Sequence, residues 1–341
     1  MLHHAWVRIA VTAGLLCAIV WFAGSRLAGD ASSLDASTIV DSAPMLGLAL
    51  AMSAFATLLL GAAWIVLIED VSPRRGRRPA LMLAFVYAWL VRYVPGTVPF
   101  FAGKVYLGQR AGHSTKQVAL ATGVQNLLEV LVSGTFGAMC IALAFGLTAG
   151  AGAYAALAVV PGVGLVALHP AIFGRLADRA LRAFGREPLP QGALPSMPCI
   201  VLASALTLVN QCLNGVAMLL VMRCITGASF ADLLLVTGAL SLAGVAGIIV
   251  VLAPAGFGVR DGVLTALLST RFAVEFAVLG AVLVRAVTIV ADITLVAIAL
   301  AADLLSGAGV ITGAFRRDRP APGPAKAPFG AEAAVTDGRP A

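Results

Sequence analysis

The chain has 341 residues, of which 60% are hydrophobic and 11% are charged, and its mean hydropathy is +0.98. No water-soluble fold can bury so much apolar surface, because soluble proteins carry charge on about a quarter of their residues. The net charge of +7 comes from Lys and Arg in short clusters between apolar runs, without the interleaved aromatics of a nucleic-acid-binding surface, so we expect an all-α polytopic membrane protein.

Six apolar runs are long enough to cross a hydrocarbon core of about 30 Å. The first run has the basic flank of a signal peptide, but we expect an uncleaved helix because everything after it is equally apolar. In chain order, the predicted spans are residues 6–23, 45–68, 117–147, 151–173, 198–223 and 275–304.

Two further apolar segments are interrupted by proline and glycine. Residues 79–109 break near Pro95 and Gly96, and residues 230–269 break within the Pro-Ala-Gly-Phe-Gly sequence that ends at Gly258. Basic loops flank the first segment on both sides, which predicts a re-entrant hairpin that returns to the cytoplasmic face. The number of crossings then requires the second hairpin to enter from the opposite face. Two such hairpins, each followed by a long helix, are typical of an inverted repeat.

The distribution of basic residues also orients the chain. The loop of residues 24–44 holds three Asp and one Arg, whereas the loop after the second span holds four Arg, so we expect the first outside and the second in the cytoplasm. Both termini then face the cytoplasm of a bacterial inner membrane. We expect residues 1–305 to form the membrane domain and residues 306–341, rich in Pro, Ala and Gly, to form a disordered tail.

Seven ionisable residues in the apolar region are functional candidates. A charge at the bilayer centre costs roughly 2.5–3.5 kcal/mol even on lenient insertion scales, so such residues usually serve a role. Structural alternatives exist: Arg92 could extend to the interface, and Arg285 and Asp292, on one helix face, could satisfy each other or pin neighbouring helices. The candidates are Arg92, Lys104, Glu129, Arg260, Asp261, Arg285 and Asp292.

Two predicted spans carry groups of amides. Gln125 and Asn126 precede Glu129 by about one turn, and residues 210–214 contain three more amides. Hydrogen bonds between helices explain such side chains without a ligand. An unpaired Glu129, by contrast, would have to be protonated or lie near an arginine.

The two breaks predict an anion site. A helix that begins inside the membrane offers unpaired backbone N–H groups and the positive end of its dipole. Lys104 and Arg260 lie close to the two predicted helix starts, so together they would bind an anionic group such as a lipid phosphate. The alternative is a pair of re-entrant loops filled only by protein packing.

The sequences at the breaks resemble a known family. Residues 252–263, Leu-Ala-Pro-Ala-Gly-Phe-Gly-Val-Arg-Asp-Gly-Val, resemble the Pro-Gly-Gly-Leu-Gly-x-Arg-Glu-Gly block of the lysylphosphatidylglycerol synthase transmembrane-region family of flippase-like membrane proteins. Residues 92–96, Arg-Tyr-Val-Pro-Gly, are similar to its Arg-x-x-Pro-Gly block. Glu129 and Arg285 fall where the family keeps an acidic helix and an arginine. The resemblance extends over about residues 6–305.

The chain departs from the family pattern at three places. Ala255 replaces a glycine, Asp261 replaces a glutamate, and Gln125-Asn126 stands where many relatives carry Glu-Arg, which removes two charges from any relay through that helix. The resemblance implies a domain that binds or moves polar-headed lipids. Its substrate site would comprise the seven ionisable candidates together with Pro95, Gly96, Pro254, Gly256 and Gly258.

We therefore expect a protein that translocates a polar or anionic-headed lipid or glycolipid, with membrane lipids and an envelope-biosynthesis enzyme as partners and no nucleic acid. No cofactor, metal site or catalytic activity is expected, since the soluble aminoacyl-transferring half of two-part relatives does not follow residue 305. Two alternatives stay open: a non-catalytic partner of an envelope enzyme, and an intramembrane enzyme with Asp261 and Glu129 as acid and base. No Gly-x-x-x-x-Gly-Lys-[Ser/Thr] loop occurs, so gradients or a partner would supply the energy.

Overall fold

The computed structural model describes residues 36–72, 78–93, 97–145, 194–249 and 258–306, with isolated positions between 172 and 182. These ranges fold into eight α-helices and two 3-10 turns and contain no strand. The helices that are long and apolar enough to cross a membrane are Ser42–Val71, Thr115–Ala144, Met197–Thr226, Phe230–Ile249 and Val274–Leu305. The predicted all-α polytopic fold is confirmed. The span predicted at residues 6–23, nearly all of 151–173, the tail, and Pro95, Gly96, Pro254 and Gly256 lie outside the described residues.

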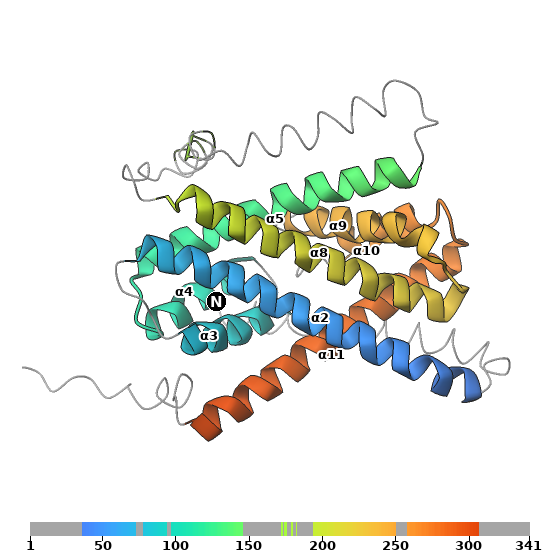
Figure 1. Ribbon diagram of the computed structural model, residues 1–341, viewed down its shortest axis with the longest axis horizontal. Helices are drawn as coiled ribbons and strands as arrows, with labels where there is room; N and C mark the ends of the chain where they lie inside the picture. The colour runs from blue at the N-terminus through green and yellow to red at the C-terminus, as the bar shows by residue number, and fades with distance from the viewer. Residues whose placement is uncertain are drawn as a thin grey trace, which may run out of the picture.

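Four long helices form the body of the bundle: α2 (Ala36–Val71), α5 (Thr115–Ala144), α8 (Met197–Thr226) and α11 (Val274–Ser306). Figure 1 shows α2, α5 and α8 along the length of the molecule and α11 crossing them obliquely. Apolar sequence of this length becomes helical in lipid because every backbone N–H and C=O must be paired within its own segment. Local signals set the ends: Ser114 and Gln117 form a capping box at the start of α5, and Gly227 ends α8 with a φ of 67°.

Contacts between helix ends fix the direction of each helix. Gln117, in the first turn of α5, donates to the Val71 carbonyl at 3.2 Å, and the Ser196 hydroxyl before α8 donates to Asp70 at 3.0 Å. Helix α2 therefore ends where α5 and α8 begin. We call this the Val71 end of the bundle, and the opposite end, where α8 stops, the Gly227 end.

The first hairpin consists of α3 (Arg78–Leu90), the 3-10 turn η1 (Val91–Tyr93) and α4 (Thr97–Arg110). At its entrance Arg78 bonds Glu69 at 2.9 Å, and just after its exit the His113 ring contacts the Ser72 hydroxyl at 3.1 Å. The hairpin thus enters and leaves at the Val71 end. Helices of 13 and 14 residues reach only about 20 Å, so the hairpin turns back before it crosses a hydrocarbon core of about 30 Å.

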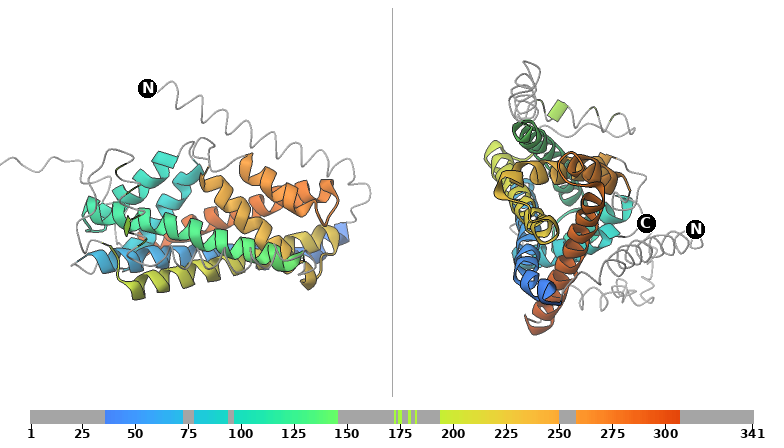
Figure 2. Two further views of the ribbon diagram at one scale, coloured as in Figure 1. Left: turned by 90° about the horizontal axis from the view of Figure 1, so that it is seen from above. Right: turned by 90° about the vertical axis from the view of Figure 1, so that its right-hand side faces the viewer.

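The second hairpin consists of the 3-10 turn η2 (Phe230–Asp232), α9 (Leu233–Ile249) and α10 (Val259–Leu268). Asp232 at its entrance pairs with Arg271 just beyond its exit at 3.0 Å, so both ends lie at the Gly227 end. With η2, the first arm is long enough to cross a membrane, whereas α10 has ten residues and spans about 15 Å. Figure 2 (left) shows the two hairpins following one another along the bundle, as the predicted opposite entries require.

Each hairpin has its own apolar core. The first packs Phe85 and Trp89 of α3 against Trp64 of α2, whose indole N–H donates to Thr122 of α5 at 2.9 Å. The second packs α9 and α10 against Met218 and Met222 of α8 and against the first half of α11. The described inner ends of the two hairpins, η1 and the first turn of α10, both lie against the middle of α11.

Candidate functional site

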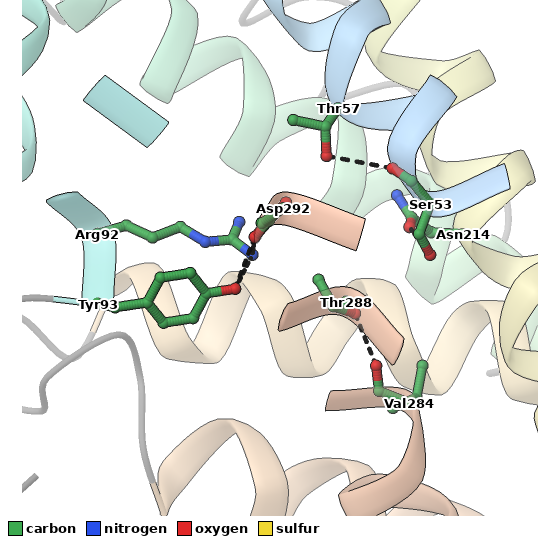
Figure 3. A network of polar contacts seen from close by, with 8 residues as sticks. All are labelled: Ser53, Thr57, Arg92, Tyr93, Asn214, Val284, Thr288 and Asp292. Carbon is green, nitrogen blue, oxygen red and sulfur yellow. Dashed lines mark hydrogen bonds and ion pairs between the residues drawn. The ribbon is translucent and has the colours of Figure 1, made fainter. Parts of the chain in front are cut away.

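The inner ends of both hairpins are tied to α11 by ion pairs. From η1, Arg92 Nη2 lies 2.8 Å from Asp292 Oδ2, and the Tyr93 hydroxyl donates to the same oxygen at 2.6 Å (Figure 3). From the start of α10, Asp261 accepts Arg285 Nη1 at 2.6 Å and 2.7 Å through its two oxygens. A single helix therefore holds the described inner ends of both hairpins.

Of the structural alternatives that the sequence left open, the structure agrees with one: Arg285 and Asp292 hold neighbouring helices to α11. Arg285 and Asp292 do not satisfy each other, because seven residues separate them by about 10 Å along the helix and each binds a different hairpin. Arg92 points inward to Asp292 and does not extend to an interface. Its guanidinium also lies 4.4 Å from the centroid of the Trp89 ring and 5.0 Å from that of Tyr93.

Lys104 is fully buried, with 0% of its surface exposed. Its ammonium donates to Gln125 Oε1 at 2.9 Å and lies 4.8, 5.5 and 4.6 Å from the ring centroids of Phe85, Trp89 and Phe100. Three aromatic faces thus replace most of its water shell. Helix α4 begins at Thr97, so Lys104 sits two turns inside the helix, and the expectation that it lies at a helix start is wrong.

Glu129 lies at the middle of α5, about 21 Å from either end of that helix. Its carboxylate is within electrostatic range of Lys104, Arg92 and Arg260. It makes no hydrogen bond or ion pair with any residue that the structure describes. The prediction that Glu129 lies deep in its span is confirmed.

Arg260 and Asp261 occupy the first turn of α10, as the sequence predicted. Gly258 precedes the helix with a φ of 86°, a left-handed conformation that glycine adopts readily. Asp261 is used by Arg285, whereas Arg260 forms no ion pair or hydrogen bond with a described residue. Arg285 and Arg92 repel its guanidinium, and Asp261 attracts it more weakly. Arg260 is therefore a half-buried cation without a carboxylate of its own.

We call the seven residues together the charge cluster. They bring four cations and three carboxylates into one electrostatically connected group, which leaves an excess of one positive charge. Asp292 is bound to Arg92 and Asp261 to Arg285, whereas Glu129 lies within electrostatic range of Lys104 and Arg260. At the centre of a membrane such an excess is costly unless an anion joins it. Its members are Arg92, Lys104, Glu129, Arg260, Asp261, Arg285 and Asp292.

Sequence reasoning missed three parts of this site. Tyr93 stands beside Arg92 in the quoted motif, and its hydroxyl proved to share Asp292. Gln125 does more than join helices, because it accepts from Lys104 and donates to the Leu60 carbonyl at 2.8 Å. The aromatic enclosure was detectable, since Phe85 and Trp89 are spaced by four residues, as are Phe100 and Lys104, which places each pair on one helix face.

The amides of α8 follow the structural expectation. Asn210 donates to the Ala56 carbonyl of α2 at 2.7 Å, and Gln211 donates to the Ser133 hydroxyl of α5. Both bonds join neighbouring helices. These amides therefore need no ligand to account for them.

Comparison with known proteins agrees with this architecture. The family described as "Lysylphosphatidylglycerol synthase TM region" matches residues 5–296, which include both hairpins and all seven residues of the charge cluster. A search of curated proteins found no match to the chain. The matched region covers well over half of the chain and extends over the five membrane-spanning helices, except for the last turns of α11. The chain therefore belongs to the lysylphosphatidylglycerol synthase transmembrane-region family and is a multi-pass membrane protein that handles lipids.

Proposed function

We propose that this protein moves a lipid with an anionic head group between the two leaflets of the bacterial inner membrane. The observation that carries the proposal is Arg260, a half-buried guanidinium that lacks a carboxylate partner among the described residues and lies beside the unbalanced charge cluster. A lipid phosphate would supply the missing negative charge. It would also meet the N-terminal amides of α10, where the helix dipole favours an anion.

The hairpins support a path for a head group. Each hairpin enters and leaves at its own end of the bundle, and α3, α4 and α10 are too short to cross a hydrocarbon core of about 30 Å. Their inner ends are held by single ion pairs to α11, which a competing phosphate could exchange for its own charge-assisted hydrogen bonds. The charge cluster would then bind the head group at mid-depth while the acyl chains stay in lipid.

The same proposal includes orientation and partners. The Val71 end would face the cytoplasm, with both termini on that side, because the Arg-rich loop after α2 lies there. Binding and movement require no bond to be made or broken, so the chain would act without catalysis, alone or beside an envelope-biosynthesis enzyme. In a cysteine-free background, impermeant maleimide should label Lys116→Cys from inside and Arg271→Cys from outside; the reverse labelling would invert the orientation.

Translocation can be measured in vesicles that contain the purified protein and head-group-labelled fluorescent phosphatidylglycerol, with dithionite to quench the outer leaflet. Arg260→Ala should lower the rate at least about tenfold, because it removes a charge-assisted contact to phosphate worth about 1.5–3 kcal/mol. Glu129→Gln should alter the rate as well. Arg223→Ala is the matched control, since Arg223 is an exposed arginine at the end of α8 and lies outside the charge cluster.

Three outcomes would contradict the proposal. Rates for the wild type that equal those of protein-free vesicles would remove translocation. Equal rates for the wild type, Arg260→Ala and Glu129→Gln, all above protein-free vesicles, would remove these residues from the path. A labelled glycolipid without charge that crosses faster than phosphatidylglycerol would show that the head group need not be an anion.

A further inference from the structure

The two ion pairs that hold the hairpins to α11 have opposite polarity. In the first pair the hairpin supplies the arginine, Arg92, and α11 supplies the carboxylate, Asp292. In the second pair the hairpin supplies the carboxylate, Asp261, and α11 supplies the arginine, Arg285. An anion that takes Arg92 would therefore displace a carboxylate of α11. An anion that takes Arg285 would instead displace the carboxylate of α10 and detach the second hairpin from α11.

The two carboxylates also differ in what their displacement would leave behind. The Asp292 side chain is only 1% exposed, and without Arg92 it would keep only the Tyr93 hydroxyl among the described residues (Figure 3). Asp261 is 28% exposed and is attracted by Arg260, so its release leaves no enclosed, unpaired charge. Because an enclosed charge without its partner is strongly destabilising, a head group would open the second ion pair and leave the first one closed.

Arg260 would bring the anion to this second ion pair. Arg260 and Asp261 are neighbours in the first turn of α10, and of the charged residues around it Arg285 acts most strongly on the Arg260 guanidinium. An anion on Arg260 is therefore within electrostatic reach of Arg285. A phosphate carries several acceptor oxygens and can bind two guanidinium groups at once. Its negative charge would repel the Asp261 carboxylate, which competes for the same arginine.

The first turn of α10 is packed loosely enough to move without the rest of its hairpin. The two side chains that dock α10 in the second core, Leu264 and Leu268, follow that turn and are at most 1% exposed. Gly258 and Gly262 frame the turn, and a Cβ on either would meet no atom within 4 Å. The ion pair at the outer end of the hairpin lies far from the turn and stays in place. Opening therefore needs only a local movement.

We propose that Arg285 is the second ligand of the anionic head group, and that its capture releases Asp261 so that the first turn of α10 moves away from α11. We call this turn the gate. The inference rests on the proposed function and adds which arginine the head group takes and which hairpin moves. The lipid itself opens the gate, while the first hairpin keeps its ion pair. When the head group leaves, Asp261 binds Arg285 again and the gate closes.

The competition for Arg285 can be tested by binding of a water-soluble lipid. Dihexanoyl phosphatidylglycerol is titrated into the purified protein in a detergent without charge, and calorimetry measures its affinity. Asp261→Asn removes the competing carboxylate and should raise the affinity at least about tenfold. Asp292→Asn is the matched variant, since it removes the same charge from the ion pair that stays closed, and it should raise the affinity less. Arg285→Lys keeps the charge but loses the forked contact to phosphate, so it should weaken binding at least about tenfold.

The movement of the gate can be measured as a distance between two spin labels in a cysteine-free background. One pair of labels is attached through Gly262→Cys in the gate and Leu304→Cys near the end of α11, where Leu304 is 62% exposed. The matched pair combines Leu304→Cys with Leu90→Cys at the inner end of α3, where Leu90 is 37% exposed. Addition of the same lipid should change the first distance and leave the second one as it was.

The gate would be refuted if the lipid did not bind, if Asp261→Asn failed to raise the affinity, or if Asp292→Asn raised it as much. Bound lipid with an unchanged first distance, or with an equal change in both distances, would refute it too. The spin labels decide the matter should Asp292→Asn fail to fold, which melting curves reveal. The outcomes are separable from those of the proposed function: lipid that crosses vesicles while the gate stays still leaves translocation standing, and a gate that opens on lipid in a protein that moves none leaves this inference standing.

Discussion

The two hairpins bring cations to the same central place, but they are packed in different ways. The first is built on aromatic side chains, with ring centroids 5.2 Å apart for Phe85 and Trp89 and 5.6 Å apart for Trp89 and Phe100. The second docks through glycine, where the backbones of α5 and α9 approach so closely that a Cβ on Gly238 would lie 2.9 Å from the Gly137 carbonyl oxygen. Aromatic enclosure seals Lys104 completely, whereas Arg260 at the start of α10 is half-buried and without a described carboxylate partner.

This difference separates support from binding. A cation enclosed by three rings and one amide is satisfied within the protein, so Lys104 stabilises the first hairpin and adds to the field at Glu129. By contrast, a cation in the first turn of a short helix, beside a glycine, is placed to bind a group from outside the protein. In the proposed translocation, the first hairpin would therefore form the fixed wall of the lipid site and the second would contact the head group.

The largest expected effect concerns the two ion pairs. Asp292→Ala should lower the free energy of unfolding by about 3–5 kcal/mol, because it leaves Arg92 buried without its carboxylate. Asp261→Ala should have a smaller effect, since the Asp261 side chain is itself 28% exposed and Arg285 keeps a further interaction when this carboxylate is removed. Denaturation of both variants in mild detergent, with near-UV circular dichroism as the signal, measures the difference. A larger loss for Asp261→Ala would reverse the comparison between the hairpins.

Lys104 offers the next test, because its surroundings predict that shape matters more than charge. Lys104→Ala should cost about 2–5 kcal/mol through the cavity it leaves among the aromatic rings. Lys104→Met should cost less than about 1.5 kcal/mol, since methionine fills a similar volume and its sulfur packs well against aromatic rings. Melting temperatures of the two variants decide the matter. Equal losses would mean that the ammonium group, and not its packing, stabilises the first hairpin.

Features that leave a local pattern in the sequence could be predicted, whereas contacts between distant residues could not. Apolar length and Pro-Gly interruptions predicted the spans and hairpins because both act locally along the chain. The charged residues stood out because charge is rare in such a sequence. Their partners did not: Arg92 and Asp292 are 200 residues apart, and no local pattern joins them.

The glycine contact predicts a contrast between two substitutions of the same type. Gly238→Ala should destabilise the protein by about 1–3 kcal/mol, because the new Cβ would press on backbone atoms of α5 that cannot move aside. Gly103→Ala in the first hairpin should be neutral or slightly stabilising, since its Cβ would meet Val91 at an ordinary 3.5 Å and alanine favours the helix. Thermal unfolding of the pair tests this. A loss for Gly103→Ala as large as that for Gly238→Ala would contradict the difference in docking.

The smallest expected effect is a pH dependence confined to the outer end of the first hairpin. Burial lowers the pKa of His113 below its usual value of 6.5, and the attraction of Glu69 opposes this shift more weakly. A proton on Nε2 would have no hydrogen-bond acceptor among the described residues. The unfolded chain therefore takes up the proton first as the pH falls through 6.5, and the folded state loses stability. Hydrogen exchange corrected for its intrinsic pH dependence should show α3 and α4 opening more readily at pH 5.5 than at 7.5. The same change should be absent in His113→Gln, and α9 and α10 should not respond in either protein, because no histidine occurs in the second hairpin. Equal changes in both hairpins would show that a group other than His113 causes the pH dependence, and that His113 does not set the stability of the first hairpin.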